Sequence, residues 1–172
     1  MNRSALRAAA LVLPLLGLAA TWTFTHVRAQ QGTEWDVPIA GYDPRDLLRG
    51  HYVIYTYDWP GLEDREPWEY AGELCIHGTA PAIEGVTVGA DPACANPVRA
   101  YAYSDDFGGG ISTGRLYVSQ AEGVRLQEQL TDPKLEGTVR IRLRDDGHIT
   151  PLRITFRPRP VEAVTAVEAS EP

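Results

Sequence analysis

The sequence predicts a mainly β fold, a small antiparallel barrel or sandwich with one or two short helices, preceded by a single N-terminal membrane-targeting helix. Three observations predict it: an apolar segment near the N-terminus, runs of β-branched and aromatic residues between turn residues, and an alternating hairpin pattern near the C-terminus. The hydrophobic content of 44% and the charged content of 23% are ordinary for a globular protein. Without a leader and a polar tail, roughly 130 residues remain, which is the size of one domain.

Residues 8–25 form a charge-free segment that follows Arg3 and Arg7. As a helix with a rise of about 1.5 Å per residue, this segment would be about 27 Å long, close to the ~30 Å of a bilayer hydrocarbon core. The basic residues before it are expected to stay inside the cell and to send the rest of the chain out. Two interpretations of residues 1–29 stay open: a retained signal anchor, or a signal peptide that is cleaved after Ala29.

The charge balance argues against several classes of partner. Three of the 16 basic residues and none of the 23 acidic residues lie in residues 1–29, so the rest of the chain carries 13 basic and 23 acidic residues, a formal charge of −10. Nucleic acid and anionic membrane surfaces bind basic proteins. We therefore expect no nucleic-acid partner, and membrane contact only through the N-terminal helix.

Residues 30–41 carry no strong hydrophobic period, and we interpret them as a linker between the leader and an exported β-rich domain at residues 42–157. Near the start of that domain Asp43 is a suitable N-cap and Gly50 a suitable helix end, which predicts a short helix or 3₁₀ turn. Residues 51–57 are β-branched and aromatic throughout, and they predict a central strand with both faces at least partly covered.

The middle of the domain predicts short strands between loops. Residues 58–69 contain prolines and many acids, which is typical of a surface loop. The other predicted elements are strands at 70–77, 98–103 and 111–119, a loop at 78–97 in which 86–88 is a candidate short strand, and a short helix at 122–130.

A C-terminal hairpin at residues 137–156 is the clearest local pattern. Its first strand alternates polar residues with Val139, Ile141 and Leu143, and the sequence Asp145-Asp146-Gly147 is typical of a hairpin turn. We expect one face of the hairpin to be buried and the other to expose its arginines to water. Residues 158–172 have no period and predict a disordered tail.

The two cysteines, Cys75 and Cys94, predict a disulfide, because an exported protein meets an oxidising environment. Closing a loop of this size would stabilise the fold by about 3 kcal/mol through the unfolded chain. A metal site from Cys75, His77 and Cys94 is the alternative, but it lacks a fourth ligand at a recognised spacing.

No catalytic residue, cofactor or metal is predicted. The sequence has no G-x-S-x-G motif, Lys134 follows Pro133 in an apparent turn, and nothing places a base beside a serine. The acidic residues between Asp58 and Glu73 lack the spacing of a calcium loop and are typical of a solvated surface.

Aromatic residues are the unusual enrichment of the domain. Most of them are expected in the core, and a possible interaction surface is formed by Trp59, Trp68 and Tyr70. An alternative function follows from the same residues: an envelope glycan-binding module in which exposed Trp59 and Trp68 stack on sugar rings.

Residues 50–57 resemble the motif that names the bacterial GDYXXLXY family. The matching positions are Gly50, Tyr52 and Tyr57, whereas His51 replaces the aspartate and Tyr55 the leucine. A later segment of the family is similar to Arg115, Tyr117 and Gly123, although Gly114, Ser119 and Gln120 depart from it. The resemblance implies an N-terminal membrane segment, an exported domain without an assigned activity, and an integral membrane protein as partner.

These observations together predict a membrane-anchored envelope protein that acts as a non-enzymatic accessory or interaction domain. We expect it in the bacterial inner membrane with its C-terminal domain in the periplasm or outside, or secreted if the chain is cleaved after Ala29. The glycan-binding module is the first alternative, and a hydrolase with a pocket of convergent polar groups is the second.

Overall fold

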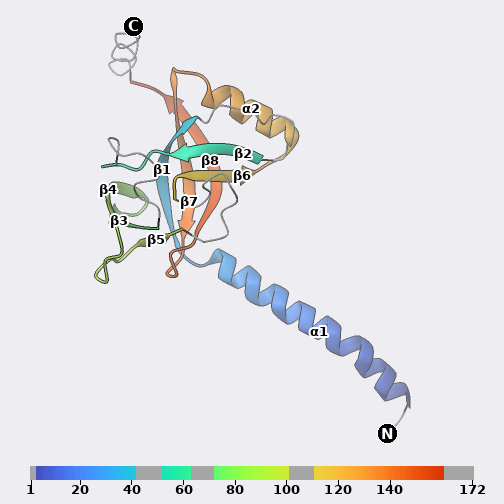
Figure 1. Ribbon diagram of the computed structural model, residues 1–172. Coiled ribbons are helices and arrows are strands. Elements are labelled where there is room, and N and C mark those ends of the chain that lie inside the picture. Colours follow the sequence, from blue (N-terminus) through green and yellow to red (C-terminus); the bar gives the residue numbers. More distant parts are fainter. Residues whose placement is uncertain (1–2, 42–51, 63–71, 101–110, 161–172) are drawn as a thin grey trace. The chain divides into compact units, whose positions relative to one another are not determined.

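The computed structural model describes residues 3–41, 52–62, 72–100 and 111–160 (Figure 1). The chain divides into two compact units, one that ends at Gly32 and one that begins at Thr33. Each unit has its own secondary structure, helical in the first and mainly β in the second.

Helix α1 (Arg3–Gln30) makes up the first unit and contains Pro14. Its large apolar side chains are exposed, among them Leu15, Leu18, Trp22 and Phe24. Its threonine hydroxyls donate back to the helix's own carbonyl oxygens, at 2.8 to 2.9 Å for the bonds that span four residues. Among the residues whose side chains are described, no helix has the length and apolar character that crossing a membrane requires.

The second unit is mainly β, an eight-stranded sheet that curls into a half-barrel, and helix α2 (Gln120–Leu130) lies between its sixth and seventh strands (Figure 1). The strands are β1 (Thr33–Gly41), β2 (Tyr52–Tyr57), β3 (Glu73–Thr79), β4 (Ala82–Val88), β5 (Pro97–Arg99), β6 (Thr113–Tyr117), β7 (Leu135–Leu143) and β8 (Ile149–Pro158). Their order is β5-β3-β4-β1-β2-β6, and β7 and β8 extend the sheet from the other edge of β1.

Strand β1 joins the three parts of the sheet. Its residues from Thr33 to Ile39 pair antiparallel with β7, and its last three residues pair antiparallel with β2. Within the first of these stretches, Asp36 also makes a parallel bridge to Ala82 of β4, and its N–H donates to the Pro81 carbonyl at 2.9 Å. The predicted antiparallel sheet is thus present, and among the described strands only β1 and β4 pair in parallel.

The interpretation of residues 30–41 as a linker is wrong, because Thr33–Gly41 is a central strand. Trp35, Val37 and Ile39 alternate into the core and are all buried. Acids and proline are depleted in strands, so the intervening Glu34, Asp36 and Pro38 make the apolar alternation of this strand hard to recognise in the sequence.

Strand β2 confirms the predicted central strand, since it pairs with β1 on one edge and β6 on the other. Val53, Tyr55 and Tyr57 point into the core, and the alternate residues are half-buried. The ring of Tyr57 lies edge-on to Tyr55 with centroids 5.3 Å apart and stacks on Trp59 at 5.1 Å. This aromatic row forms the core beneath β2 and β6.

The candidate short strand at 86–88 is confirmed as the end of β4, but the prediction of a loop is wrong for residues 82–85, which belong to the same strand. Within β4 only Val86 is buried. Gly78 makes the turn before it possible, because its φ is +132° and an added Cβ would lie 2.6 Å from the Ala82 carbonyl oxygen. The predicted disulfide between Cys75 and Cys94 is present, with the two Cα atoms 5.8 Å apart.

Helix α2 and the C-terminal hairpin confirm their predictions. Ser119 caps α2, its hydroxyl oxygen accepts from the Glu122 N–H at 3.4 Å, and Leu126 anchors the helix in the core. The hairpin turns through Gly147, which has a φ of +85°. Strand β8 includes Pro158, so the ordered chain continues past the predicted start of the tail, and residues 161–172 lie outside the described part. The predicted helix at 43–50 also lies outside it.

Candidate interaction surface

The outward side of the β2–β6 pair carries the candidate surface. On this side Tyr52 pairs with Tyr117, and Ile54 pairs with Arg115. The two strands are adjacent and antiparallel, so side chains on directly paired residues project from the same face. Residues 65 positions apart in the sequence, Tyr52 and Tyr117, are thereby brought together.

Two aromatic rings and one guanidinium form a cluster here, which we call the outward patch and define as Tyr52, Arg115 and Tyr117. The rings of Tyr52 and Tyr117 meet edge to face, with centroids 5.9 Å apart and an interplanar angle of 64°. The Arg115 guanidinium carbon lies 5.7 Å from the centroid of the Tyr52 ring, within the range of a cation–π interaction. Tyr117 is 73% exposed, so the cluster faces solvent on one side.

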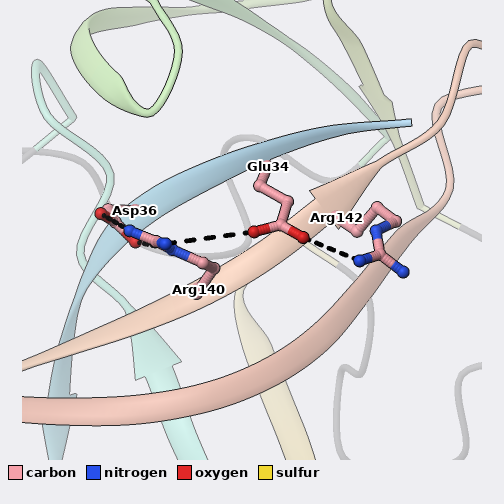
Figure 2. Close-up of polar contacts among 4 residues, drawn as sticks. All are labelled: Glu34, Asp36, Arg140 and Arg142. Carbon is pink, nitrogen blue, oxygen red and sulfur yellow. Dashed lines mark hydrogen bonds and ion pairs between the residues drawn. The ribbon is translucent and has the colours of Figure 1, made fainter. Parts of the chain in front are cut away.

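A second polar cluster lies on the outward side of β1 and β7, and we call it the ion-pair ladder (Figure 2). Arg140 donates to both carboxylate oxygens of Asp36, at 2.7 and 2.6 Å, and Arg142 donates to Glu34 at 2.7 Å. The hydrogen bond from Arg140 lowers the pKa of Asp36, partly offset by burial. These arginines lie on the outward face, as predicted, but they are only partly exposed because acids of β1 pair with them. The ladder therefore holds β1 against β7.

A small cavity of about 140 Å³ lies where β1, β7 and the end of α2 meet. Its polar groups include Thr131, Asp132 and Arg159. The Thr131 hydroxyl donates to the Gln127 and Glu128 carbonyls, and an Asp132 carboxylate oxygen accepts from the Lys134 N–H. These side chains therefore end the helix and shape the turn after it. Within the described ranges, no group of three or more His, Cys, Asp or Glu residues could hold a metal ion.

Comparison with known proteins adds one decisive match. A family model described as GDYXXLXY protein matches residues 14–154. The chain belongs to the GDYXXLXY family. No curated protein and no solved structure matches the chain.

The residues that carry the family motif separate onto two sides of β2. Tyr55 and Tyr57 point inward, where burial raises the pKa of both phenols, that of Tyr57 to about 12. Tyr52 points outward and joins Arg115 and Tyr117 from the later family segment. The named motif therefore supplies both core and surface residues.

The glycines of the family segments also have different roles. Gly114 pairs directly with Tyr55, and a Cβ there would lie 2.5 Å from the Tyr55 ring, so this departure from the family pattern accommodates a bulky ring. Gly123 lies in α2, where an added Cβ would meet, of the described residues, the Val118 side chain at an ordinary 3.6 Å. Gly50 and His51 lie outside the described residues.

The predicted interaction surface of Trp59, Trp68 and Tyr70 is wrong for its first member. Trp59 is only 1% exposed, and its indole N–H donates to the Ile111 carbonyl at 2.7 Å. A buried indole cannot stack on a sugar, so Trp59 cannot be one of the predicted pair of exposed tryptophans. Trp68 and Tyr70 lie outside the described part of the chain.

The outward patch could not be identified as one surface from the sequence alone. Tyr52, Arg115 and Tyr117 each stand out through the family resemblance, but their meeting depends on the register of β2 against β6. The alternation of Tyr52, Ile54 and Thr56 with Val53, Tyr55 and Tyr57 is the signal that places Tyr52 opposite the buried tyrosines.

Proposed function

We propose that this protein is a membrane-anchored, extracytoplasmic envelope protein whose β domain is a non-enzymatic accessory domain for an integral membrane partner. The observation that carries the proposal is the outward patch, a solvent-facing cluster of Tyr52, Arg115 and Tyr117 on two paired strands. Tyrosine and arginine are, with tryptophan, enriched among the residues that contribute most binding energy at protein interfaces. Paired strands also present them without a large loss of conformational entropy on binding.

The composition of α1 supports its role as the anchor. Its apolar side chains are exposed in the described chain, and hydrocarbon would cover them favourably. The hydroxyls of Thr21, Thr23 and Thr25 are bonded within the helix, which reduces the cost of placing them in an apolar medium. Arg3 and Arg7 before the apolar segment favour an inside N-terminus and an exported domain.

The disulfide supports export. Disulfides persist in the periplasm and outside the cell, whereas the cytosol keeps thiols reduced. The bond from Cys75 to Cys94 ties β3 to the segment before β5, and Ile76 and Asn96 exchange further hydrogen bonds beside it. We therefore place the β domain on the oxidising side of the inner membrane.

The connection between anchor and domain favours a partner close to the membrane. Only Gln31 and Gly32 separate the end of α1 from the start of β1. Two residues span at most about 7 Å of extended chain. A domain with so short a tether would meet a membrane protein more readily than a distant soluble one.

Recovery of the full-length chain in mild detergent, after crosslinking in intact cells, tests the proposal. We expect one integral membrane protein to be recovered with it, and we expect the chain to stay with membranes after an alkaline carbonate wash. A matched chain in which residues 1–29 are replaced by a cleavable signal peptide should be released into the soluble fraction. Purification of the full-length chain as a single component would contradict the association.

A further inference from the structure

We propose that the small cavity at the end of α2 is a binding site for a small aliphatic amino acid in its zwitterionic form. The cavity has a volume of about 140 Å³ and lies where the end of β1, the end of α2 and the start of β7 meet. Such a site would serve a task separate from partner binding, so it goes beyond the proposed function. Three features of the cavity support it: two opposite charges that do not pair, a helix end, and an apolar wall.

One acidic and one basic side chain line the cavity without pairing with each other. Asp132 follows the end of α2, and Arg159 follows the end of β8. The Arg159 Nε is buried and has no hydrogen-bond partner among the described residues, and no ion pair joins this guanidinium to Asp132. A buried donor without an acceptor costs free energy, which favours a bound molecule that supplies one. A carboxylate is the acceptor that best fits a guanidinium.

The side of the cavity formed by the end of α2 favours a positive charge. The last carbonyl groups of a helix carry partial negative charge. Helix α2 has no basic residue in its last turn to offset this charge, and Asp132 adds a carboxylate just beyond the helix. One Asp132 oxygen accepts the Lys134 N–H at 2.9 Å, and a carboxylate can accept further hydrogen bonds. An ammonium group is therefore the complement of this side.

Apolar side chains also line the cavity, and its volume limits the size of a ligand. They include Ile39 at the end of β1, Leu130 at the end of α2 and Leu135 at the start of β7. A cavity of roughly 150 Å³ holds a ligand the size of benzene, with about six non-hydrogen atoms. Alanine is a molecule of that size, and its ammonium, carboxylate and methyl groups match the acid, the base and the apolar wall.

The experiment compares three probes on the full-length chain in detergent by ligand-observed nuclear magnetic resonance. L-Alanine carries both charges, propionate lacks the ammonium group, and ethylamine lacks the carboxylate. We expect L-alanine to bind with half-saturation below about 10 mM, which is within reach of so small a ligand. Propionate and ethylamine should each bind at least about tenfold more weakly, because each leaves one charged side chain of the cavity without its partner.

Substitutions at the cavity make the test specific to this site. Asp132→Asn keeps an acceptor for the Lys134 N–H but removes the charge, so L-alanine should then bind no better than propionate. Arg159→Gln should likewise remove the preference for L-alanine over ethylamine. The control Arg157→Gln changes an exposed arginine that pairs with Glu136, and it should leave L-alanine binding unchanged.

The absence of saturable L-alanine binding up to about 100 mM would overturn the proposal, since water alone would then fill the cavity. Propionate or ethylamine that binds as tightly as L-alanine would also overturn it, and so would full L-alanine affinity in either cavity variant. The three probes are compared on the unaltered chain, so they decide the question even if a variant fails to fold. Recovery of the membrane partner tests the proposed function separately, and its failure would leave the amino-acid site standing.

Discussion

The two sides of β2 carry the same kind of side chain in different surroundings. On the inward side Tyr55 and Tyr57 are buried, and their hydroxyl oxygens lie 3.5 Å apart beside Trp59. On the outward side Tyr52 is half-buried and meets Tyr117 and the Arg115 guanidinium. One strand thus provides part of the core and part of the candidate interaction surface.

This difference shows that an aromatic motif need not have one role. Because side chains of a strand alternate between faces, residues two apart share a role and neighbours do not. Burial makes Tyr55 and Tyr57 sensitive to volume and to ionisation, whereas the exposed Tyr117 is available to a partner. The two sides should therefore respond to substitution in opposite ways, in stability on the inward side and in binding on the outward side.

The largest expected effect compares Tyr55→Ala with Tyr117→Ala in urea unfolding. Tyr55 is fully buried, so its truncation should cost about 3–5 kcal/mol, as for other large aromatic side chains in cores. Tyr117→Ala should stay within about 0.5 kcal/mol of the unaltered chain, as is usual for surface positions. Similar losses in both variants would remove the distinction between the two sides.

A smaller effect is expected from Gly114→Ala, which tests how closely the inward side is packed. A Cβ at this position would lie 2.5 Å from the Tyr55 ring, and a fully buried ring has little room to move. We expect a loss of about 1–3 kcal/mol from overpacking. Gly85→Ala is the control, because its Cβ would meet no atom of the described residues within 4 Å, and it should be neutral or slightly stabilising. A neutral Gly114→Ala would mean that the ring is not held there.

The pH dependence of stability should report the buried tyrosines. Burial raises the pKa of Tyr57 to about 12, above the value of about 10 in an unfolded chain. The neutral Tyr57 phenol contributes stability that is present in full below about pH 10 and is lost as the pH rises from about 10 to 12. Tyr57→Phe should reduce that loss in short urea-unfolding measurements across this range. The same dependence of the unfolding free energy on pH in both proteins would argue against a buried Tyr57 phenol.

The smallest expected effect concerns the ion-pair ladder, which also lies on an outward face. The pKa of Asp36 is lowered by its bond from Arg140, so this carboxylate contributes stability above about pH 3.9 that is lost as the pH falls through its folded pKa. Asp36→Asn should cost at most about 1 kcal/mol at neutral pH, since the pair is partly solvated. It should make the free energy of unfolding less dependent on pH in the acid range. It should also leave recovery of the membrane partner unchanged. Loss of the partner would show that the outward patch is not the sole contact.

Local patterns predicted much of the fold. Strand β2, helix α2, the β7–β8 hairpin and the disulfide all follow from residues close together in the sequence. Strand β1 was missed because Glu34 and Asp36 interrupt its apolar residues, and the arginines that pair with them lie more than 100 residues away in the sequence. Strand β4 was predicted only over residues 86–88, because its first four residues include no buried side chain that would mark them as part of a strand.

The candidate site was less predictable than the fold. Trp59 was assigned to a surface because its type suits one, but its place beneath Ile111 is set by long-range packing. Tyr52, Arg115 and Tyr117 were each identified by family resemblance, and only strand register brings them together. Register between strands that are distant in sequence depends on the whole sheet, and no local pattern specifies it.

Recovery of the membrane partner by a chain that carries Tyr52→Ala and Tyr117→Ala tests the central claim most directly. The measurement is made in the same cells as for the unaltered chain, together with the urea midpoint of both proteins. We predict at least about tenfold less partner and nearly the same midpoint, because the outward patch binds and the inward side holds the fold. Full recovery, or a loss of partner that follows a fallen midpoint, would contradict this account.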